Sequence, residues 1–259
     1  MSRMLLGPLA LALALVPAAA GAGKPREALG LTAAPARLLF DGDGLATVRL
    51  RNPGRKAVAV TVASAGFALD LRGRPRIVKR RGPRSAAGWL RLRPARLRLA
   101  PHAAAKLLVS ARLPRGADPG DHDALVVLSA RPLARARVSV RLRLGVVVVV
   151  RAPGAVVRRL KLRRLRVARR AGKRALELVV VNSGNVTERL LHVRATLSRP
   201  RSSRRIAVVR ASARELRAHT LGLLEFRLRT SANGPVTAHV VVPAEPGRPV
   251  IRRTYRLRI

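Results

Sequence analysis

The sequence predicts an all-β protein made of two tandem immunoglobulin-like β-sandwich domains that follow a cleaved signal peptide. Three observations support this prediction. Apolar residues recur at every second position in many short segments, which is the pattern of strands with one buried face. Proline, glycine and asparagine punctuate the gaps between these segments, and no segment after the leader shows a long amphipathic helical pattern. Many short strands divided by turn signals are typical of a sandwich.

The composition indicates a folded protein with an aliphatic core and a very basic surface. Hydrophobic residues make up 48% of the 259 residues, too many for a disordered basic tail. There is no cysteine, which excludes disulfides, thiolate metal sites and cysteine nucleophiles. Lys and Arg number 54 against 12 Asp and Glu, for a net charge of +42, and 48 of these cations are arginine. Aromatic residues are scarce, so a site that stacks sugars or single-stranded nucleic acid is not favoured, and nucleic acid is not an expected partner.

Residues 1–22 have the pattern of a secretory signal peptide. Arg3 supplies the positive start, residues 4–16 form an apolar run, and small residues at 18–22 provide cleavage options. The run is shorter than a membrane-spanning helix, and no second apolar segment of spanning length follows it. We therefore expect a secreted protein of the cell envelope, periplasmic if the source has an outer membrane, with no transmembrane segment in the mature chain.

The first predicted sandwich covers residues 23–152. A turn at Asn52-Pro53-Gly54 joins its first two alternating segments into a hairpin. Trp89 lies in an expected strand, where core packing is favoured over ligand stacking. The strands expected in this domain, in chain order, cover residues 45–51, 57–63, 89–93, 96–99, 106–113, 124–130 and 135–150.

The pattern stops at Ala152-Pro153-Gly154 and restarts in a second predicted sandwich, residues 155–259. The best candidate for a short helix in this half is 210–219. The expected strands cover residues 160–167, 174–181, 189–197, 206–210, 221–229, 236–242 and 250–259. A linker this short predicts restricted motion between the domains.

Arginines recur at i, i+2 with an apolar residue between them. In a strand this spacing places both guanidiniums on one face and the apolar residues on the other. One interpretation is the solvated face of each sheet, with the arginine surplus following from a GC-rich genome. The other is a basic face that binds a polyanion, for which Arg91 and Arg93 are candidate partner-binding residues. The arginine pairs are Arg49/Arg51, Arg91/Arg93, Arg96/Arg98, Arg135/Arg137, Arg141/Arg143, Arg227/Arg229 and Arg256/Arg258.

Two families resemble the first half. The Gly88-Trp89-Leu90 run, the Pro94 to Pro101 strand and the Leu113-Pro114 to His122 turn resemble the N-terminal domain of the WxL-interacting cell-surface proteins. That resemblance implies a non-enzymatic surface protein, one domain facing a wall polymer and the other a protein partner. The start, Arg37-Leu38-Leu39-Phe40 and a hairpin, is similar to periplasmic pilus chaperones. That similarity implies that Arg37 offers its guanidinium to a partner's C-terminal carboxylate.

The sequence contains no familiar catalytic or phosphate-binding motif, and its five histidines are scattered singly. Asp118, Asp121 and Asp123 form its only acidic cluster, which is either a weak metal-site candidate or a Pro-Gly turn entering a strand. In a strand, Asp121 and Asp123 share one face and His122 points away. We expect no enzyme activity and no cofactor.

The function predicted from the sequence is a non-enzymatic, exported cell-envelope binding or adhesion-scaffold protein. Its expected partners are an anionic cell-wall polymer or peptidoglycan and a surface protein. The alternatives are a pilus-chaperone-like periplasmic assembly protein and an exported polyanion-binding protein.

Overall fold

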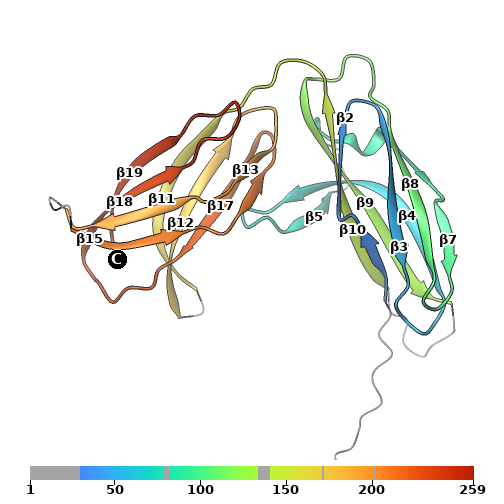
Figure 1. The fold of residues 1–259 in the computed structure, drawn as a ribbon, viewed down its shortest axis with the longest axis horizontal. Helices are drawn as coiled ribbons and strands as arrows, with labels where there is room; N and C mark the ends of the chain where they lie inside the picture. Colours follow the sequence, from blue (N-terminus) through green and yellow to red (C-terminus); the bar gives the residue numbers. More distant parts are fainter. Residues whose placement is uncertain (1–29, 79–81, 134–140, 171, 201, 203) are drawn as a thin grey trace, which may run out of the picture.

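The computed structural model describes residues 30–78, 82–133, 141–170, 172–200, 202 and 204–259. The predicted signal peptide and the Arg135/Arg137 pair lie outside these residues. The described chain folds into two β-sandwiches that meet at an angle, joined by the segment between β10 and β11 (Figure 1). Among the described residues, no helix has the length and apolar character to cross a membrane.

The first sandwich packs one sheet of order β1-β3-β8-β6 against another of order β2-β10-β9-β4-β5, in which β7 also pairs with β4. Strand β2 runs parallel to β10, whereas the other pairings are antiparallel. The elements of this sandwich are β1 (Thr32–Ala34), β2 (Arg37–Asp41), β3 (Gly44–Arg51), β4 (Val58–Leu69), β5 (Pro75–Val78), the short 3-10 helix η1 (Ala86–Gly88), β6 (Leu90–Arg93), β7 (Arg96–Leu99), β8 (Ala104–Ala111), β9 (Gly120–Pro132) and β10 (Leu142–Ala152).

The second sandwich packs a sheet of order β11-β12-β17 against one of order β15-β14-β18-β19, and β13 and β16 form a separate two-stranded ribbon. Its strands are β11 (Leu160–Arg170), β12 (Lys173–Asn182), β13 (Glu188–Leu190), β14 (Arg194–Ser198), β15 (Arg205–Arg210), β16 (Arg214–Leu216), β17 (Thr220–Arg227), β18 (Pro235–Val242) and β19 (Ile251–Arg258). The all-β fold class and the two immunoglobulin-like sandwiches predicted from the alternating pattern are confirmed.

Alternation along the strands explains the two separate cores. In β3, Val48 and Leu50 are fully buried while Arg49 and Arg51 are exposed. The same division recurs in the other described strands that carry arginine pairs, so the pleat places leucine and valine inward and guanidinium outward. The second core is built in the same way around Leu176, Leu178 and Phe226.

Three details differ from the expectations. The segment 210–219 contains β16 instead of a helix, because Arg214–Leu216 pairs with β13 and Leu216 is buried. The strand expected at 189–197 is divided into β13 and β14, and His192 between them has a positive φ of 52°. Trp89 precedes β6 instead of starting it; it caps η1 and packs against the first core.

A buried asparagine occupies the same kind of corner in each sandwich. The Nδ2 of Asn52, just after β3, donates to the carbonyls of Lys56, Leu99 and Ala100. The Nδ2 of Asn182, at the end of β12, donates to the carbonyls of Val186, Leu216 and Arg217. In both cases the Oδ1 accepts from the glycine amide two residues later. The Asn-x-Gly sequence therefore forms the same hydrogen-bonded turn, which we call the asparagine corner, once in each sandwich.

Candidate functional site: the cleft between the sandwiches

A cleft lies where the two sandwiches meet. It encloses a cavity of about 370 Å³ whose walls come from both halves of the chain. The first sandwich contributes Arg37 of β2 and an apolar wall formed by Phe67, Val147 and Val149. The second contributes residues of the β16 region and Thr187, so the cleft exists only when both sandwiches are in place. The lining residues from the second sandwich are Thr187, Ala213, Arg214, Glu215 and Arg217.

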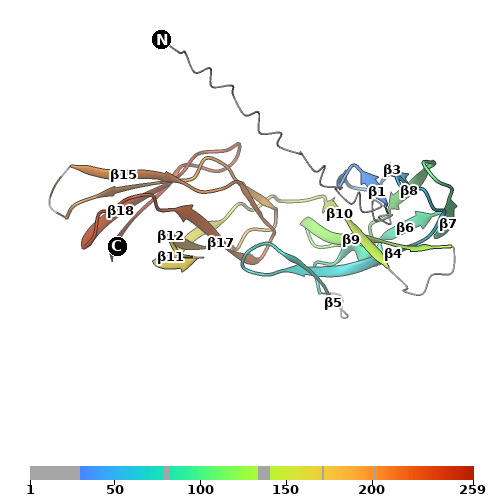
Figure 2. The ribbon, with the colours of Figure 1, turned by 90° about the horizontal axis from the view of Figure 1, so that it is seen from below.

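Residues of the β4–β5 hairpin line one side of the cleft. The hairpin reaches across to β17 (Figures 1 and 2). At its tip, the carbonyl of Leu71 accepts a hydrogen bond of 2.7 Å from the amide of Leu223. The Oδ1 of Asp70 accepts from the amides of Arg72 and Arg74, and the Arg74 bond is the main reason that the pKa of Asp70 is lowered. This local turn fixes the direction in which Arg72 leaves the hairpin.

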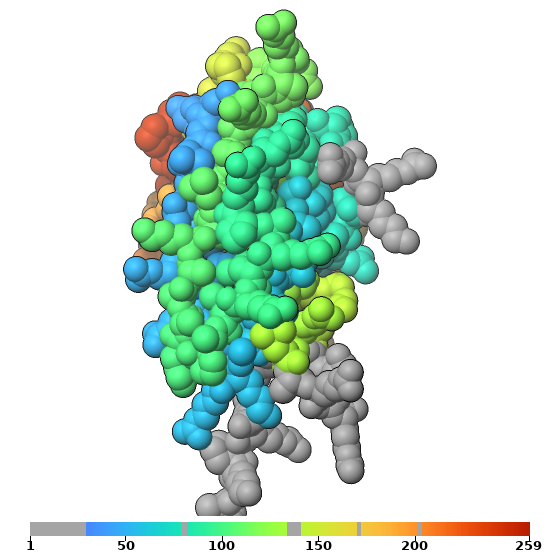
Figure 3. Space-filling model, turned by 90° about the vertical axis from the view of Figure 1, so that its right-hand side faces the viewer, coloured from blue at the N-terminus to red at the C-terminus, as the bar shows by residue number. Residues whose placement is uncertain are grey.

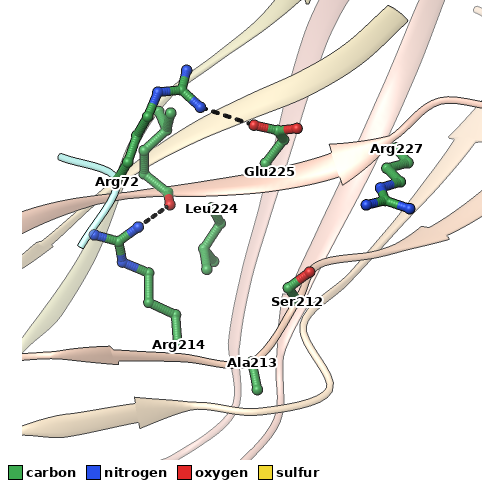
Figure 4. Close-up of a pocket in the computed structure, with 8 residues that line it drawn as sticks. Arg72, Ser212, Ala213, Arg214, Leu224, Glu225 and Arg227 are labelled. Atoms are coloured by element: carbon green, nitrogen blue, oxygen red, sulfur yellow. Dashed lines mark hydrogen bonds and ion pairs between the residues drawn. The ribbon is translucent and has the colours of Figure 1, made fainter. Parts of the chain in front are cut away.

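Arg72 joins the hairpin to two carboxylates of the second sandwich. Its guanidinium lies 2.7 Å from the carboxylate of Glu177 and 3.0 Å from that of Glu225, the contact seen in Figure 4. Glu177 has no exposed side-chain surface, and its other oxygen accepts two hydrogen bonds from Arg166. A buried carboxylate is tolerated when it is paired and hydrogen-bonded on both sides, as Glu177 is.

Arg214 is held between two glycines, one from each sandwich. A Cβ on Gly73 would lie 3.2 Å from the guanidinium of Arg214, and a Cβ on Gly222 would lie 3.1 Å from its Nε. Its Nη1 donates to the carbonyl of Leu223, and burial lowers the pKa of the guanidinium. Arg214 also borders a second cavity of about 310 Å³, shown in Figure 4, beside Arg72.

The start of β9 forms the other side of the junction. The amide of Asp121 donates to the carbonyl of Asn185, and its carboxylate accepts from the amide of Thr187 and from Arg151. The carboxylate of Asp123 lies 3.2 Å from the guanidinium of Arg217. Burial raises the pKa of Asp123 to about 6, against the opposing effect of the Arg217 charge.

The three metal-site candidates lie at or near this part of the junction. Asp121 and Asp123 share one face, as the strand pattern predicted, and both contact the second sandwich. His122 points the other way and its ring lies 4.3 Å from that of Trp89, while Asp118 is exposed. Within the described part of the chain, no group of three His, Asp or Glu residues is placed to hold a metal ion.

Carboxylates are concentrated at this junction. Although the chain has only 12 acidic residues, five of them contact a group of the opposite sandwich. The protein has a net charge of +42, so the two sandwiches repel each other. The few carboxylates oppose this repulsion because they lie where the sandwiches meet. The five are Asp121, Asp123, Glu177, Glu215 and Glu225.

The structure separates the three partner-binding candidates. Arg37 lies in the cleft, opposite Val147 in the parallel pair of β2 and β10, and its guanidinium pairs with Glu215. Arg91 and Arg93 lie on β6, in the other sheet of the first sandwich, and are exposed. Sequence reasoning missed Glu215 and the Arg72 bridge, because the partners of both ion pairs are more than 100 residues apart.

No family model matches the chain, and neither does any curated protein. Among solved structures, the E. coli chaperone DraB is similar, with 13% identity and a TM-score of 0.46 over 89% of this chain and 96% of DraB. A chain of the CsuC-CsuE chaperone–tip adhesion subunit complex of Acinetobacter baumannii has 12% identity and a TM-score of 0.48, covering 88% and 98%. The CupB2 chaperone of Pseudomonas aeruginosa has 15% identity and a TM-score of 0.42, covering 87% and 98%. These likenesses concern the fold; they assign no role to a residue of this chain and give the WxL-interacting resemblance no support.

Proposed function

We propose that the chain is a non-enzymatic, exported binding protein that holds the end of an extended polypeptide in the cleft, as an assembly chaperone does. The observation that carries this proposal is the position of Arg37. Its side chain is 36% exposed at a cavity of about 370 Å³, beside the apolar wall formed by Phe67, Val147 and Val149. A guanidinium next to an apolar surface suits a terminal carboxylate that follows apolar side chains, and such a carboxylate would replace Glu215 as the partner of the planar fork.

The edge position of β2 supports the same proposal. Strand β2 ends its sheet, so one side of its backbone has no neighbouring strand among the described residues. An extended polypeptide can pair with such an edge while its terminal carboxylate reaches Arg37. Backbone pairing would supply affinity and the guanidinium would fix the register of the bound chain. Contact with an anionic wall polymer, the other partner expected from the sequence, has no support from the similar structures.

A peptide with and without a free C-terminus tests this function. The probe is a fluorescent peptide of alternating Val and Thr, prepared as the free acid and as the C-terminal amide, and binding is followed by anisotropy. We expect the amide to bind about 10- to 100-fold more weakly, the range of one charge-assisted hydrogen-bonded contact. Arg37→Ala should weaken binding of the acid by the same factor and leave the amide unchanged.

The matched control is Arg256→Ala, which removes one exposed cation of β19 far from the cleft lining. It should leave binding of both peptides unchanged. Equal affinity for acid and amide, or an equal effect of Arg37→Ala and Arg256→Ala, would refute the proposed function.

A further inference from the structure

A band of uncompensated cations crosses the outer face of the sheet β1-β3-β8-β6. Each of these side chains is exposed and, among the described residues, none forms an ion pair with a carboxylate. Strands β3, β6 and β8 contain no Asp or Glu at all. The residues of this basic band are Arg49 and Arg51 of β3, Lys106 of β8, and Arg91 and Arg93 of β6.

Strand register arranges the band as a diagonal. Arg49 lies directly opposite Lys106 in the β3–β8 pair. Further along β8, Arg93 lies opposite Leu108 and Arg91 lies opposite Ser110. The cations therefore step from β3 across β8 to β6 as β8 is followed toward its C-terminal end. With a rise of about 3.4 Å per residue and about 4.8 Å between strands, the band is roughly 20 Å long.

Repulsion between the cations of the basic band lowers the stability of this sheet. Like charges directly opposite each other on a sheet destabilise the pair, and Arg49 opposite Lys106 is such a pair. Outward positions between the cations hold small or apolar side chains such as Thr47, Leu108 and Ser110. An external polyanion would relieve this repulsion, because no carboxylate of the described residues forms an ion pair with these cations.

We propose that the basic band binds a linear phosphate polymer through its guanidinium and ammonium groups. Guanidinium forks match phosphate oxygens, and four of the five cations are arginine. The face carries no aromatic side chain on which a ring could stack. Strands β3 and β8 each have a neighbouring strand on both sides, so a peptide lying across the band would find few partners there for its own backbone, whereas a phosphate chain requires none.

The band and the cleft are separate sites. Figure 3 views the molecule from the right-hand side of Figure 1, so the first sandwich faces the viewer. None of the five cations lines the cavity of about 370 Å³ between the sandwiches. Polymer binding is therefore expected to leave the cleft free, and it does not depend on the function proposed for Arg37.

Titration with size-fractionated linear polyphosphate tests the proposal. Five contacts predict that affinity falls about 100-fold between about 50 and 200 mM salt, using the coefficient for single-stranded phosphate chains. The double variant Arg91→Gln/Arg93→Gln leaves three contacts, so its affinity should fall only about 20-fold over the same range. The control, Arg256→Gln/Arg258→Gln, removes the same charge from β19 and should keep the wild-type salt dependence.

Two results would overturn the proposal. If the β6 and β19 variants lose affinity and salt dependence equally, binding reflects net charge and not the band. If poly-L-glutamate of matched charge binds as tightly as polyphosphate, the assignment of phosphate is wrong. Far-ultraviolet circular dichroism of each variant verifies that the sandwiches are intact, and polyphosphate binding by Arg37→Ala at the wild-type level would show that the two sites are independent.

Discussion

Arg217 of the second sandwich and Asp123 of the first form an ion pair of 3.2 Å that crosses the junction between them. The same guanidinium lies 4.3 Å above the ring of Phe67 and donates to the Phe67 carbonyl. The second oxygen of Asp123 is buried without a hydrogen-bond partner among the described residues. Desolvation of the carboxylate therefore outweighs its attraction to Arg217, and the pKa of Asp123 is raised to about 6.

Acidification through the raised pKa of Asp123 should stabilise the folded state. The folded state holds the Asp123 proton more tightly than the unfolded chain, whose pKa is near 3.8. Folding therefore takes up a proton between these values, and the free energy of unfolding rises as pH falls through about 6. The contribution of Asp123 is about 3 kcal/mol, fully present below the unfolded pKa. Urea unfolding at a series of pH values should show this rise in the wild type and a flatter profile in Asp123→Asn. Parallel profiles for the two proteins would contradict it.

Removing Arg72 should release the β4–β5 hairpin from the second sandwich. Arg72→Ala takes away the cation that crosses the junction to Glu177, so the hydrogen bond from Leu223 to the hairpin tip should open more often. We expect hydrogen exchange at the Leu223 amide to accelerate about tenfold or more, the effect of losing one charge-assisted contact.

The control for this experiment is Arg166→Ala, which removes a partner of Glu177 that lies within the second sandwich. That variant should lower the stability of its own sandwich and have a smaller effect on the Leu223 amide. Equal acceleration in both variants would mean that Arg72 has no special role in docking the hairpin.

Gly120 should be intolerant of any side chain. Its φ is 105°, and a Cβ would lie 2.2 Å from the carbonyl oxygen of Asn185, across the junction. We expect Gly120→Ala to lower the free energy of unfolding by about 3 kcal/mol or more, through backbone strain together with this clash. Gly116 is the matched control, because its φ is also positive, at 72°, but nothing lies within 4 Å of its Cβ position. Gly116→Ala should cost about 1 kcal/mol; similar losses for both, measured by denaturant unfolding, would rule out the clash.

Asn182 should be essential to the second sandwich. Asn182→Ala leaves the buried carbonyls of Val186, Leu216 and Arg217 without their donor, so we expect a loss of about 3 kcal/mol in chemical denaturation. Asn233→Ala, at an exposed asparagine that accepts from Arg174, should cost less than about 1 kcal/mol. Comparable losses in the two variants would show that the corner hydrogen bonds are dispensable.

The strands could be predicted because the alternation of apolar and charged residues lies within each strand. Alternation of Leu with Arg, as in Leu90 to Arg93, specifies a strand and the orientation of its faces without knowledge of the partner strand. The segment 210–219 could not be predicted in this way. Its Arg, Ala and Leu residues have good helix propensity, and only pairing with β13 and with Phe226 makes it extended.

The site was predicted less completely than the fold. Arg37 could be singled out only through a resemblance, and its ion pair with Glu215 joins residues 178 positions apart. Asp121 and Asp123 were identified as a cluster, but whether they meet a metal ion or another domain depends on what packs against β9. The repeated Asn-x-Gly at 52 and 182 was visible in the sequence, and it marks corresponding corners that alternation alone does not reveal.

The placement of the acidic residues has a consequence for how this protein responds to electrolyte. Salt screens the repulsion between exposed guanidiniums more strongly than it screens the attraction in an ion pair with a buried carboxylate, such as Arg72 with Glu177. Moderate ionic strength should therefore weaken the electrostatic repulsion between the two basic sandwiches. The ion pairs that join the sandwiches should be affected less. The two sandwiches are therefore expected to be docked most firmly at moderate ionic strength and less firmly in dilute buffer.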